Sequence, residues 1–522
     1  MTGRLRLLAA GCIALTVVGL PGAAAADKAN PSGLGKDLDA LLASAELTGG
    51  QAGLVVRDAD SGAVVYSRQA DSLLSPASNG KLLTSAAALE VLGPDYRFAT
   101  TVSSSGTRAG PVLAGDLYLK GTGDPTMLAR DYQDLARTVA ASGLRTVTGR
   151  LVADDTWFDS ARLGAGWAWD DEPYYYDAQI SALTMAPDTD YDAGSIIVKV
   201  SPTEAGRPAS VELDPPTDYV RVANTAVTGK AGTASTVDVD RAHGGNTITV
   251  SGSIPVGAEP DSEFMAVWNP TAFVASVFSK ALADNGVRVL GGTAYGATPS
   301  TVTQLAGRQS IPLSQLQVPF LKLSNNMHAE ILTKAAGRKV FGAGTWEAGL
   351  RALSDKLTEL GVDSTGTRMV DGSGLSRMDL VSAGQLASLL MTARSRPWFQ
   401  SWYDALPVAG NHDRLTGGTL RNRMGGTPAA NNVHAKTGSL TAVSALSGYV
   451  TAANGEKLVF SLLENNFLAD SVTDVEDAVA VRLASYGGAG SSAAAHPLPP
   501  REGRALRSGH RAGLECSWTK MC

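Results

Sequence analysis

The segment Pro76-Ala77-Ser78-Asn79-Gly80-Lys81-Leu82-Leu83-Thr84 places a serine and a lysine three residues apart, directly before an apolar helical pattern. Apolar residues recur at helical spacing over 81–92, and a proline just ahead is a usual place for a helix to begin. We therefore expect Ser78 near the N-terminus of a helix, with Lys81 one turn further along the same face.

This arrangement can activate a serine hydroxyl, which is a poor nucleophile at neutral pH unless a base lies within hydrogen-bond reach. Lys81 can approach the Oγ atom of Ser78 and accept its proton if burial beside other cations keeps the amine neutral. The helix N-terminus favours negative charge that develops at Ser78. Spacing alone is weak evidence, because Ser517-Trp518-Thr519-Lys520 has the same spacing without a following helix.

A second motif, Ser324-Asn325-Asn326, precedes a helical pattern over 327–340. Ser324 is a candidate proton shuttle between Lys81 and a leaving amine. Asn326 is a candidate to hold Lys81 and to donate its amide N–H to a substrate carbonyl. The alternative is a plain N-cap, since Ser and Asn are preferred at that position.

A third motif, Lys436-Thr437-Gly438-Ser439, precedes a strand-like pattern. We expect Lys436 and Thr437 to bind a carboxylate, and Gly438 to let the substrate lie close to the backbone. The N–H groups of Ser78 and Ser439 would then form an oxyanion hole. The alternative for Lys436 is a charge that discourages pairing at a sheet edge.

The order of the three motifs is more informative than any one of them. Ser-x-Asn and Lys-Thr-Gly each occur once in the chain, and both follow Ser78. Together they indicate an acyl-transferring serine enzyme with a covalent intermediate. The sequence has no His-Glu-x-x-His, no Gly-x-Ser-x-Gly and no histidine cluster at metal-ligand spacing, so we expect neither a metal nor a cofactor. Gly121-Thr122-Gly123-Asp124-Pro125 is interpreted as a turn, because no phosphate-binding lysine follows it.

The two ends of the chain supply the elements of one antiparallel sheet with helical cover, an α+β arrangement. The sequence predicts a hairpin over 52–69, strands over 442–450 and 457–463, and a closing helix over 474–486.

The interval between the first two motifs suggests an insertion. Roughly 240 residues separate Lys81 from Ser324, far more than a compact catalytic domain requires. We therefore predict a catalytic domain over 27–99 and 266–486, and an inserted region over 100–265 built as two small β-rich domains. Helical patterning over 271–285 falls just after that region.

Charge and targeting signals limit the cellular setting. The net charge of −6 argues against non-specific nucleic-acid binding. A basic start, an apolar run over 7–20 and alanines at 23–26 predict a signal peptide over 1–26, a secreted, extracytoplasmic protein and no stable membrane span. The run is short for a spanning helix, which makes an uncleaved anchor the weaker alternative. Cys516 and Cys522 would form a disulfide in a flexible tail over 487–522.

Five segments of the chain resemble a known family, the low-molecular-mass, class C penicillin-binding proteins of the D-Ala-D-Ala carboxypeptidase/endopeptidase S13 type. They are residues 76–84, Leu323-Ser324-Asn325-Asn326, Asp371-Gly372-Ser373-Gly374-Leu375-Ser376-Arg377, Ala435-Lys436-Thr437-Gly438-Ser439 and Leu514-Glu515-Cys516-Ser517-Trp518. The resemblance implies a penicillin-binding, transpeptidase-like domain, in which an antiparallel five-stranded sheet is flanked by helices and interrupted by inserted domains. It leaves open whether the tail is processed.

The resemblance also implies an activity in the cell wall. It implies cleavage of the terminal D-Ala from peptidoglycan stem peptides and of D-Ala–diaminopimelate cross-links, with β-lactams acylating the nucleophile. It assigns the family's roles to this chain as nucleophile Ser78, base Lys81, second motif Ser324 and Asn326, and third motif Lys436. The alternatives are a serine β-lactamase or esterase of the same fold, and a non-catalytic wall-binding protein, against which the intact motif residues argue.

A side-chain pocket is implied by the resemblance as well. In one relative a pocket receives the zwitterionic end of a diaminopimelyl side chain, and its residues match Asp171, Tyr176 and Arg377. Asp171 would bind the ammonium group and Arg377 the carboxylate. The pocket's tryptophan position falls on Ala168, and Leu440 stands where the relative has a methionine. The alternative is a surface charge pair of little energetic value.

Overall fold

The computed structural model describes residues 33–363 and 366–488. The expected signal peptide over 1–26, the Cys516–Cys522 disulfide, the Ser517–Lys520 segment and residues 489–522 of the expected tail lie outside the described residues. Among the described residues, no helix combines the length and the apolar composition that a membrane crossing requires.

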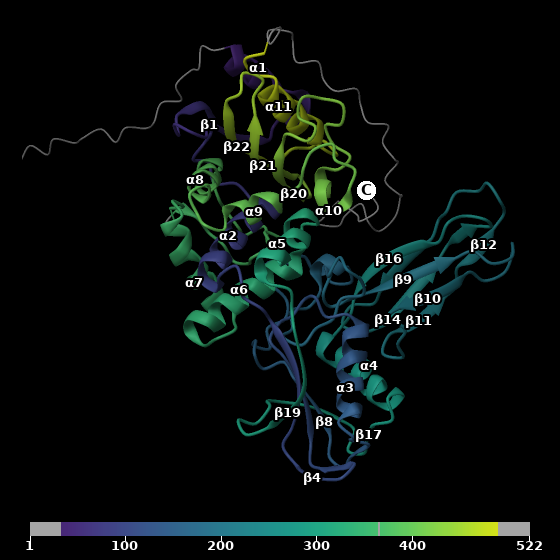
Figure 1. Cartoon of the computed structure of the whole chain (residues 1–522). Coiled ribbons are helices and arrows are strands. Elements are labelled where there is room, and N and C mark those ends of the chain that lie inside the picture. Colours follow the sequence, from purple (N-terminus) through teal and green to yellow (C-terminus); the bar gives the residue numbers. More distant parts are fainter. Residues whose placement is uncertain (1–32, 364–365, 489–522) are drawn as a thin grey trace, which may run out of the picture.

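Five antiparallel strands form the sheet of the catalytic domain, in the order β2-β1-β22-β21-β20 (Figure 1). The predicted hairpin, the two predicted C-terminal strands and the α+β class are confirmed. The strands are β1 (Gln51–Asp58), β2 (Val64–Arg68), β20 (His434–Leu440), β21 (Val443–Thr451) and β22 (Lys457–Asn465).

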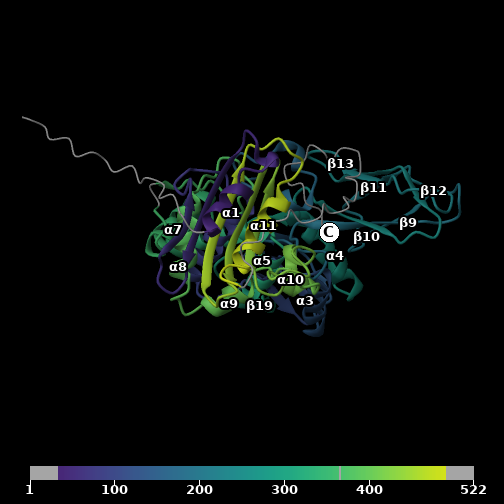
Figure 2. The same cartoon turned by 90° about the horizontal axis from the view of Figure 1, so that it is seen from above.

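Helices cover both faces of this sheet (Figure 2). Side chains alternate between two apolar layers, because successive residues of a strand point to opposite faces. Leu54 and Phe460 pack with α1 and α11, whereas Val55 and Leu463 pack with α2 and α8 on the other face. The helices of the catalytic domain are α1 (Gly33–Leu41), α2 (Gly80–Leu92), α5 (Leu313–Lys322), α6 (Asn326–Phe341), α7 (Trp346–Glu359), α8 (Ala383–Ala393), α9 (Phe399–Asp404), α10 (Arg414–Gly417) and α11 (Thr473–Ala484).

The inserted region begins with a mixed module that lies below the catalytic domain in Figure 1. Its sheets have the orders β18-β8-β6-β3-β19 and β17-β7-β5-β4, and two helices pack on them. The elements are β3 (Ala99–Ser104), β4 (Thr107–Ala109), β5 (Val112–Ala114), β6 (Leu117–Gly121), α3 (Ala129–Ala141), β7 (Thr146–Val147), β8 (Leu151–Asp154), α4 (Pro270–Asp284), β17 (Arg288–Val289), β18 (Thr293–Tyr295) and β19 (Thr303–Gln309).

The pairing of β19 places the end of the inserted region later than residue 265. β19 pairs with β3, and β18 pairs in parallel with β8, so residues 288–309 belong to the inserted sheets and not to the catalytic domain. The predicted helix over 271–285 forms as α4, but it packs with α3 in this module. The predicted boundary at residue 265 therefore lies too early in the chain. It could not be predicted more closely, because strand pairing between segments so far apart leaves no local sequence signal.

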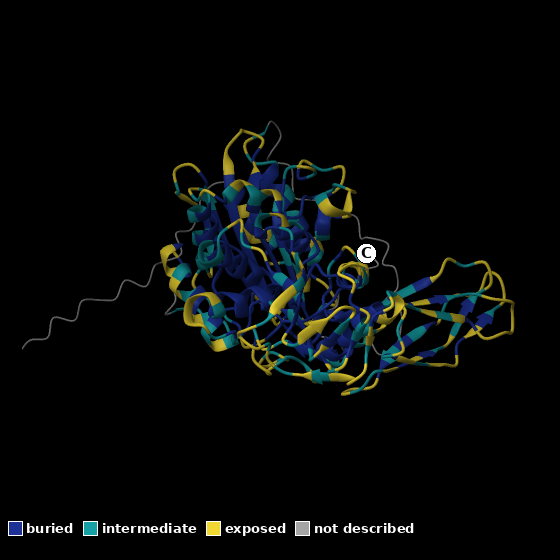
Figure 3. Ribbon diagram, turned by 60° about the horizontal axis from the view of Figure 1, so that its bottom comes forward, coloured by how far each residue is buried: buried dark blue, intermediate teal, exposed yellow. Residues whose placement is uncertain are grey.

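A second, all-β module projects from the first and ends far from the catalytic domain (Figure 3). Buried residues alternate with more exposed ones along β12, β13, β14 and β15, as expected for thin sheets with one apolar face. The strands are β9 (Ser195–Ser201), β10 (Ser210–Asp214), β11 (Arg221–Asn224), β12 (Val227–Gly229), β13 (Asp238–Arg241), β14 (Thr247–Ser251), β15 (Ser253–Pro255) and β16 (Asp261–Ala266).

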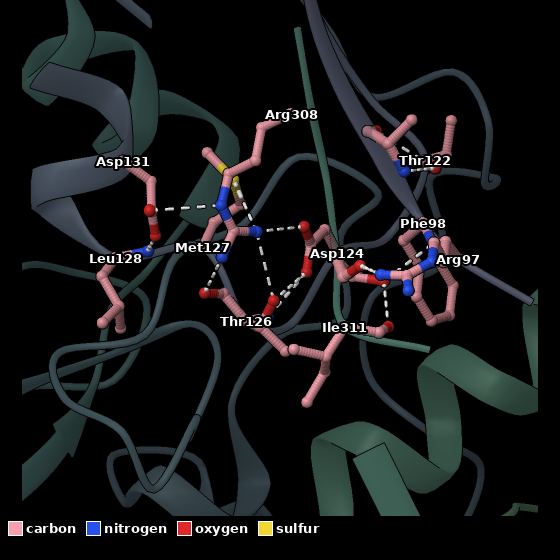
Figure 4. Close-up of polar contacts among 12 residues, drawn as sticks. Arg97, Phe98, Thr122, Asp124, Thr126, Met127, Leu128, Asp131, Arg308 and Ile311 are labelled. Carbon is pink, nitrogen blue, oxygen red and sulfur yellow. Dashed lines mark hydrogen bonds and ion pairs between the residues drawn. The ribbon is translucent and has the colours of Figure 1, made fainter. Parts of the chain in front are cut away.

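An ion-pair cluster holds the inserted region where it joins the catalytic domain (Figure 4). Arg308 of β19 pairs with the buried Asp124 at 2.7 Å and with Asp131 of α3 at 3.2 Å. Asp124 also accepts the hydroxyl of Thr126 at 2.7 Å. The glycine-rich segment 121–125 is thus a turn after β6 that carries one member of this cluster.

Candidate active site

The nucleophile candidate lies in a tight turn before α2. Ser78 belongs to the 3-10 turn η2 (Ala77–Asn79), and Lys81 Nζ lies 2.7 Å from Ser78 Oγ. Ala77 has a φ of 45°, a conformation that is costly for a residue with a Cβ atom and that clusters at functional sites. A Cβ atom on Gly374 would lie only 1.8 Å from the carbonyl oxygen of Ala77, so the loop beneath this turn requires glycine.

Lys81 is buried beneath the turn and has a second anchor. Its Nζ atom donates to the carbonyl oxygen of Ser373 at 2.8 Å. Lys436 is buried as well, and its desolvation, followed by the charge of Lys81, lowers the pKa of Lys436 well below its usual value. The site therefore contains two buried amines, and the charge of Lys81 disfavours the charged form of Lys436.

The second motif pairs with the third. Ser324 also has a positive φ, of 57°, and its hydroxyl accepts a hydrogen bond from Lys436 Nζ at 2.8 Å. The structure thus contains two serine–lysine pairs, one within the first motif and one between the second and third motifs. The expected proton transfer between Lys81 and Ser324 stays a prediction.

The two asparagines of the second motif have different partners. Asn325 caps α6 by accepting from the N–H group of His328 at 3.2 Å, so the N-cap alternative also holds for this motif. Asn326 donates its side-chain amide to the carbonyl oxygen of Tyr176 at 2.8 Å. This bond connects the second motif to the segment that contains Asp171 and Tyr176, and the expected contact of Asn326 with Lys81 stays a prediction.

The third motif lies on β20, which passes directly over the nucleophile turn. Asn79 donates its side-chain amide to the carbonyl oxygen of Lys436 at 3.1 Å, and the hydroxyls of Thr437 and Thr419 are 2.8 Å apart. A Cβ atom on Gly438 would lie 2.8 Å from Pro76 O and 3.1 Å from Ser78 N. Gly438 is therefore needed for the strand to approach Ser78, a reason that the motif alone did not provide. Ser439 follows on the same strand and is partly exposed.

The three pocket residues lie in two loops. Tyr176 donates its phenol to Asp171 Oδ1 at 2.9 Å, and both side chains are buried. Arg377 is exposed and donates to the carbonyl oxygen of Thr441, in the turn between β20 and β21. Ala168 precedes the 3-10 turn η3 (Trp169–Asp171), so no aromatic ring occupies its position.

Two fully buried carboxylates, those of Asp371 and Glu330, lie next to the site, and neither is predicted from the sequence to be functional. Asp371 and Glu330 accept hydrogen bonds from the backbone of the loop that contains Ser373. Burial, followed by the charge of Asp371, raises the pKa of Glu330 to about 7. Asp371 belongs to the family-like segment over 371–377, but its type and spacing alone indicate no catalytic function. Glu330 has no local sequence signal, since it lies inside an ordinary helix.

Three aspartates, Asp188, Asp190 and Asp192, bring one oxygen each within 4.8 Å of one another. Arg414 donates to both oxygens of Asp190 at 2.5 Å, and Asn325 donates to Asp192 at 2.9 Å. Arg414 offsets one of the three negative charges, and the two contacts connect residues 188–192 to α10 and to the second motif.

The residues of this site belong to a stretch of sequence that matches a known protein family. The model of the D-Ala-D-Ala carboxypeptidase 3 (S13) family matches residues 34–486, which includes all three motifs and both inserted modules. The chain belongs to this family. Membership of the S13 family makes the protein a serine hydrolase with a transpeptidase-like domain. The family that the motif residues led us to expect is therefore confirmed.

Several relatives of this S13 chain are similar over most of their length. It is 46% identical over 515 residues to the D-alanyl-D-alanine carboxypeptidase of Actinomadura sp., covering 97% of this chain and 94% of the relative. It is 29% identical over 488 residues to carboxypeptidase DacB of Mycolicibacterium smegmatis, covering 90% and 88%. Among solved structures, penicillin binding protein 4 of Haemophilus influenzae superposes with a TM-score of 0.72 at 25% identity, covering 83% of this chain and 93% of that one.

Proposed function

We propose that this chain is a D-Ala-D-Ala carboxypeptidase and DD-endopeptidase that acts on peptidoglycan stem peptides and their cross-links through an acyl-enzyme on Ser78. The single observation that carries the proposal is the pairing of Ser78 Oγ with the buried amine of Lys81 at 2.7 Å, beneath a strand with Lys-Thr-Gly. A serine with a buried amine in reach has both the nucleophile and the base that acyl transfer requires.

Substrate binding begins at the third motif. The terminal carboxylate of the peptide binds to Lys436 and Thr437, and the scissile carbonyl oxygen lies against the N–H groups of Ser78 and Ser439. An arriving carboxylate favours the protonated form of Lys436, which burial and Lys81 otherwise disfavour.

Acylation transfers the peptide to the serine. Lys81 accepts the Ser78 proton while Ser78 Oγ forms a bond to the carbonyl carbon, and the bond from that carbon to the terminal D-Ala nitrogen then breaks. Ser324, hydrogen-bonded to Lys436, delivers its hydroxyl proton to the leaving amine and regains a proton from Lys81, which becomes neutral again. The proton taken from Ser78 thus leaves with the D-Ala amine. Water then attacks the ester carbonyl, one of its protons passes to the Ser78 oxygen as the ester bond breaks, and the shortened peptide leaves with a new carboxyl group.

The pocket residues are proposed to select the stem peptide. Asp171, with Tyr176 bonded to it at 2.9 Å, binds the ammonium group of a free diaminopimelyl end, and Arg377 binds its carboxylate. Stem peptides with and without that free end test this part. Asp171→Asn is expected to remove the preference for the free end while leaving release from the truncated peptide unchanged; equal preference in both proteins would contradict it.

We further propose that residues 1–26 direct export to the cell wall and are removed, and that Cys516 and Cys522 close a disulfide loop. N-terminal sequencing of the protein released by its host and mass analysis before and after reduction test the two statements.

Labelled penicillin and D-Ala release together test the main proposal. A persistent adduct that Ser78→Ala abolishes, with an unchanged melting temperature, supports the peptidase. Rapid turnover of the penicillin would support instead the β-lactamase alternative, and D-Ala release by pure Ser78→Ala protein would contradict the acyl-enzyme.

A further inference from the structure

The amine of Lys81 is anchored at Ser78, inside the first catalytic motif, and at Ser373, outside the three motifs. Its Nζ atom lies 2.7 Å from Ser78 Oγ and donates to the carbonyl oxygen of Ser373 at 2.8 Å. A neutral amine has a single lone pair, so an N–H group donated to a fixed carbonyl limits the directions in which that lone pair can point. The position of the Ser373 carbonyl therefore controls how well Lys81 can take the Ser78 proton.

Asp371 holds the loop that presents this carbonyl. Its Oδ1 atom accepts from the N–H groups of Ser373 at 3.1 Å and Gly374 at 2.8 Å. Its Oδ2 atom accepts from the N–H group of Ser376 at 2.7 Å. The loop is folded around one fully buried carboxylate, since charge-assisted bonds to backbone N–H groups are stronger than neutral ones.

Glu330 holds the same loop from α6. It accepts from the N–H group of Gly372 at 2.9 Å and from that of Ser373 at 2.7 Å. Its Oε2 atom also accepts from the indole of Trp346 at 2.7 Å, which fixes the carboxylate itself. Glu330 thus restrains the peptide groups on both sides of Gly372. The next peptide group, which contains the Ser373 carbonyl, is held by the bond from Gly374 N–H to Asp371, so this carbonyl has little freedom to rotate.

A tryptophan connects this loop to the segment that carries the pocket residues. Trp167 donates its indole N–H to Asp371 Oδ2 at 2.9 Å and packs edge-on against Trp346, with ring centres 6.0 Å apart. Trp167 lies four residues before Asp171 in the sequence. The loop beneath Lys81 and the proposed pocket therefore share one buried carboxylate.

We propose that Asp371 and Glu330 are positioning residues for acylation, which set the Ser373 carbonyl and thereby aim the amine of Lys81 at Ser78, and that Trp167 couples this arrangement to the pocket segment. This inference rests on the proposed function. It assigns a purpose to Asp371-Gly372-Ser373-Gly374, of which the three-motif mechanism makes no use.

Acylation by a fluorescent penicillin under stopped flow separates the acylation rate constant from the dissociation constant of the complex that precedes it. A misplacement of a catalytic group by about 1 Å can cost about 10²-fold in rate. We expect Glu330→Gln and Asp371→Asn to lower the rate constant by about that factor with little change in the dissociation constant. Adding Trp346→Phe to Glu330→Gln is expected to restore part of the rate, since it removes an indole donor that faces the new amide.

The control is Glu90→Gln. Like Glu330, Glu90 accepts a hydrogen bond from an indole N–H group, that of Trp398 at 2.8 Å. Unlike Glu330, it has no hydrogen bond to the 371–376 loop or to a motif residue among the described residues. It is expected to acylate at the wild-type rate. If the two main variants do not fold, Trp167→Phe and Trp346→Phe replace them, with an expected loss of about tenfold in the rate constant alone. Wild-type rates in folded variants, or equal changes in both constants, would overturn the inference. Absence of acylation in the wild-type protein would instead count against the proposed function.

Discussion

Lys436 donates its side-chain nitrogen to the hydroxyl of Ser324 at 2.8 Å, so the second and third motifs meet in a single hydrogen bond. Ser78 and Lys81 form an equivalent pair at 2.7 Å. Two serine–lysine pairs thus face one substrate site. In the proposed mechanism, one pair starts the reaction, and the other binds the terminal carboxylate and supplies a proton to the leaving group.

Ser324→Ala is expected to lower the acylation rate constant by about 10²–10⁴-fold, the usual contribution of a positioned proton donor. Stopped-flow acylation by a fluorescent penicillin measures this rate constant. The variant should retain the wild-type melting temperature, because it removes one hydroxyl and leaves Lys436 with a second acceptor, the carbonyl oxygen of Thr437 at 2.7 Å. An unchanged rate constant would exclude Ser324 from proton transfer.

Substrate binding is expected to take up a proton at pH values below 10.5, the ordinary pKa of a lysine. The pKa of Lys436 lies well below its usual value in the free protein because of burial and the charge of Lys81, and a bound carboxylate raises it again. Binding should therefore weaken as the pH rises. Calorimetry of Ser78→Ala with a D-Ala-D-Ala peptide, in buffers of different ionisation enthalpy, measures the uptake. A peptide with a C-terminal amide is the control, and its binding should be accompanied by a smaller uptake of protons.

Gly438→Ala is expected to slow acylation and to destabilise the protein by about 1–3 kcal/mol, as overpacking does. Its Cβ atom would lie 2.8 Å from Pro76 O, so either β20 or the nucleophile turn must shift. Gly425→Ala is a suitable control, since a Cβ atom there meets nothing within 4 Å. Thermal unfolding and penicillin acylation measure both effects, and equal behaviour of the two variants would contradict the close approach.

Glu464→Gln is expected to stabilise the protein at neutral and higher pH. Burial, followed by the charge of Glu476, raises the pKa of Glu464 well above 4.5, and neither carboxylate oxygen has a hydrogen-bond partner among the described residues. Above pH 4.5 the carboxyl group of Glu464 is deprotonated in the unfolded chain but still protonated in the folded protein. The stability of the wild-type protein therefore falls as the pH rises from 4.5 to the folded-state pKa. The loss is about 1.4 kcal/mol for each unit by which the two pKa values differ.

Melting temperatures between pH 4 and 8 provide the comparison. The difference between Glu464→Gln and wild type should be small at about pH 4 and should grow toward pH 8. The exposed Glu456→Gln, in the turn before the same strand, should show no such trend. A constant difference across this range would contradict the raised pKa.

Arg308→Ala is expected to destabilise the protein by about 3 kcal/mol, because it leaves the buried carboxylate of Asp124 without its cation. The comparison is Arg150→Ala, whose pair with Asp116 at 3.3 Å is more exposed and should cost at most about 1 kcal/mol. Urea unfolding measures both. Similar values would show that the cluster in Figure 4 contributes no more than a surface pair.

The sequence was sufficient for the parts of the fold that depend on local pattern. The hairpin of β1 and β2, the strands β21 and β22, and helices α2, α6 and α11 form where periodicity predicts them. The partners of Ser324 and Asn326 were not predictable, because side-chain pairing depends on how separate elements pack. Glu330 was missed for the same reason: nothing in its helix distinguishes it from a solvated glutamate until the loop at Gly372 is placed against it.

The inserted region leaves and re-enters the catalytic domain at adjacent points, since Leu313 and Ser314 donate backbone N–H groups to Tyr96 and Pro94 at 2.9 Å. An ancestral enzyme could therefore have gained the whole insertion at one loop without parting α2 from α5. Yet the same insertion contributes the Tyr176 carbonyl that holds Asn326. Any change in the path of this segment would therefore also move the partner of a residue in the second motif.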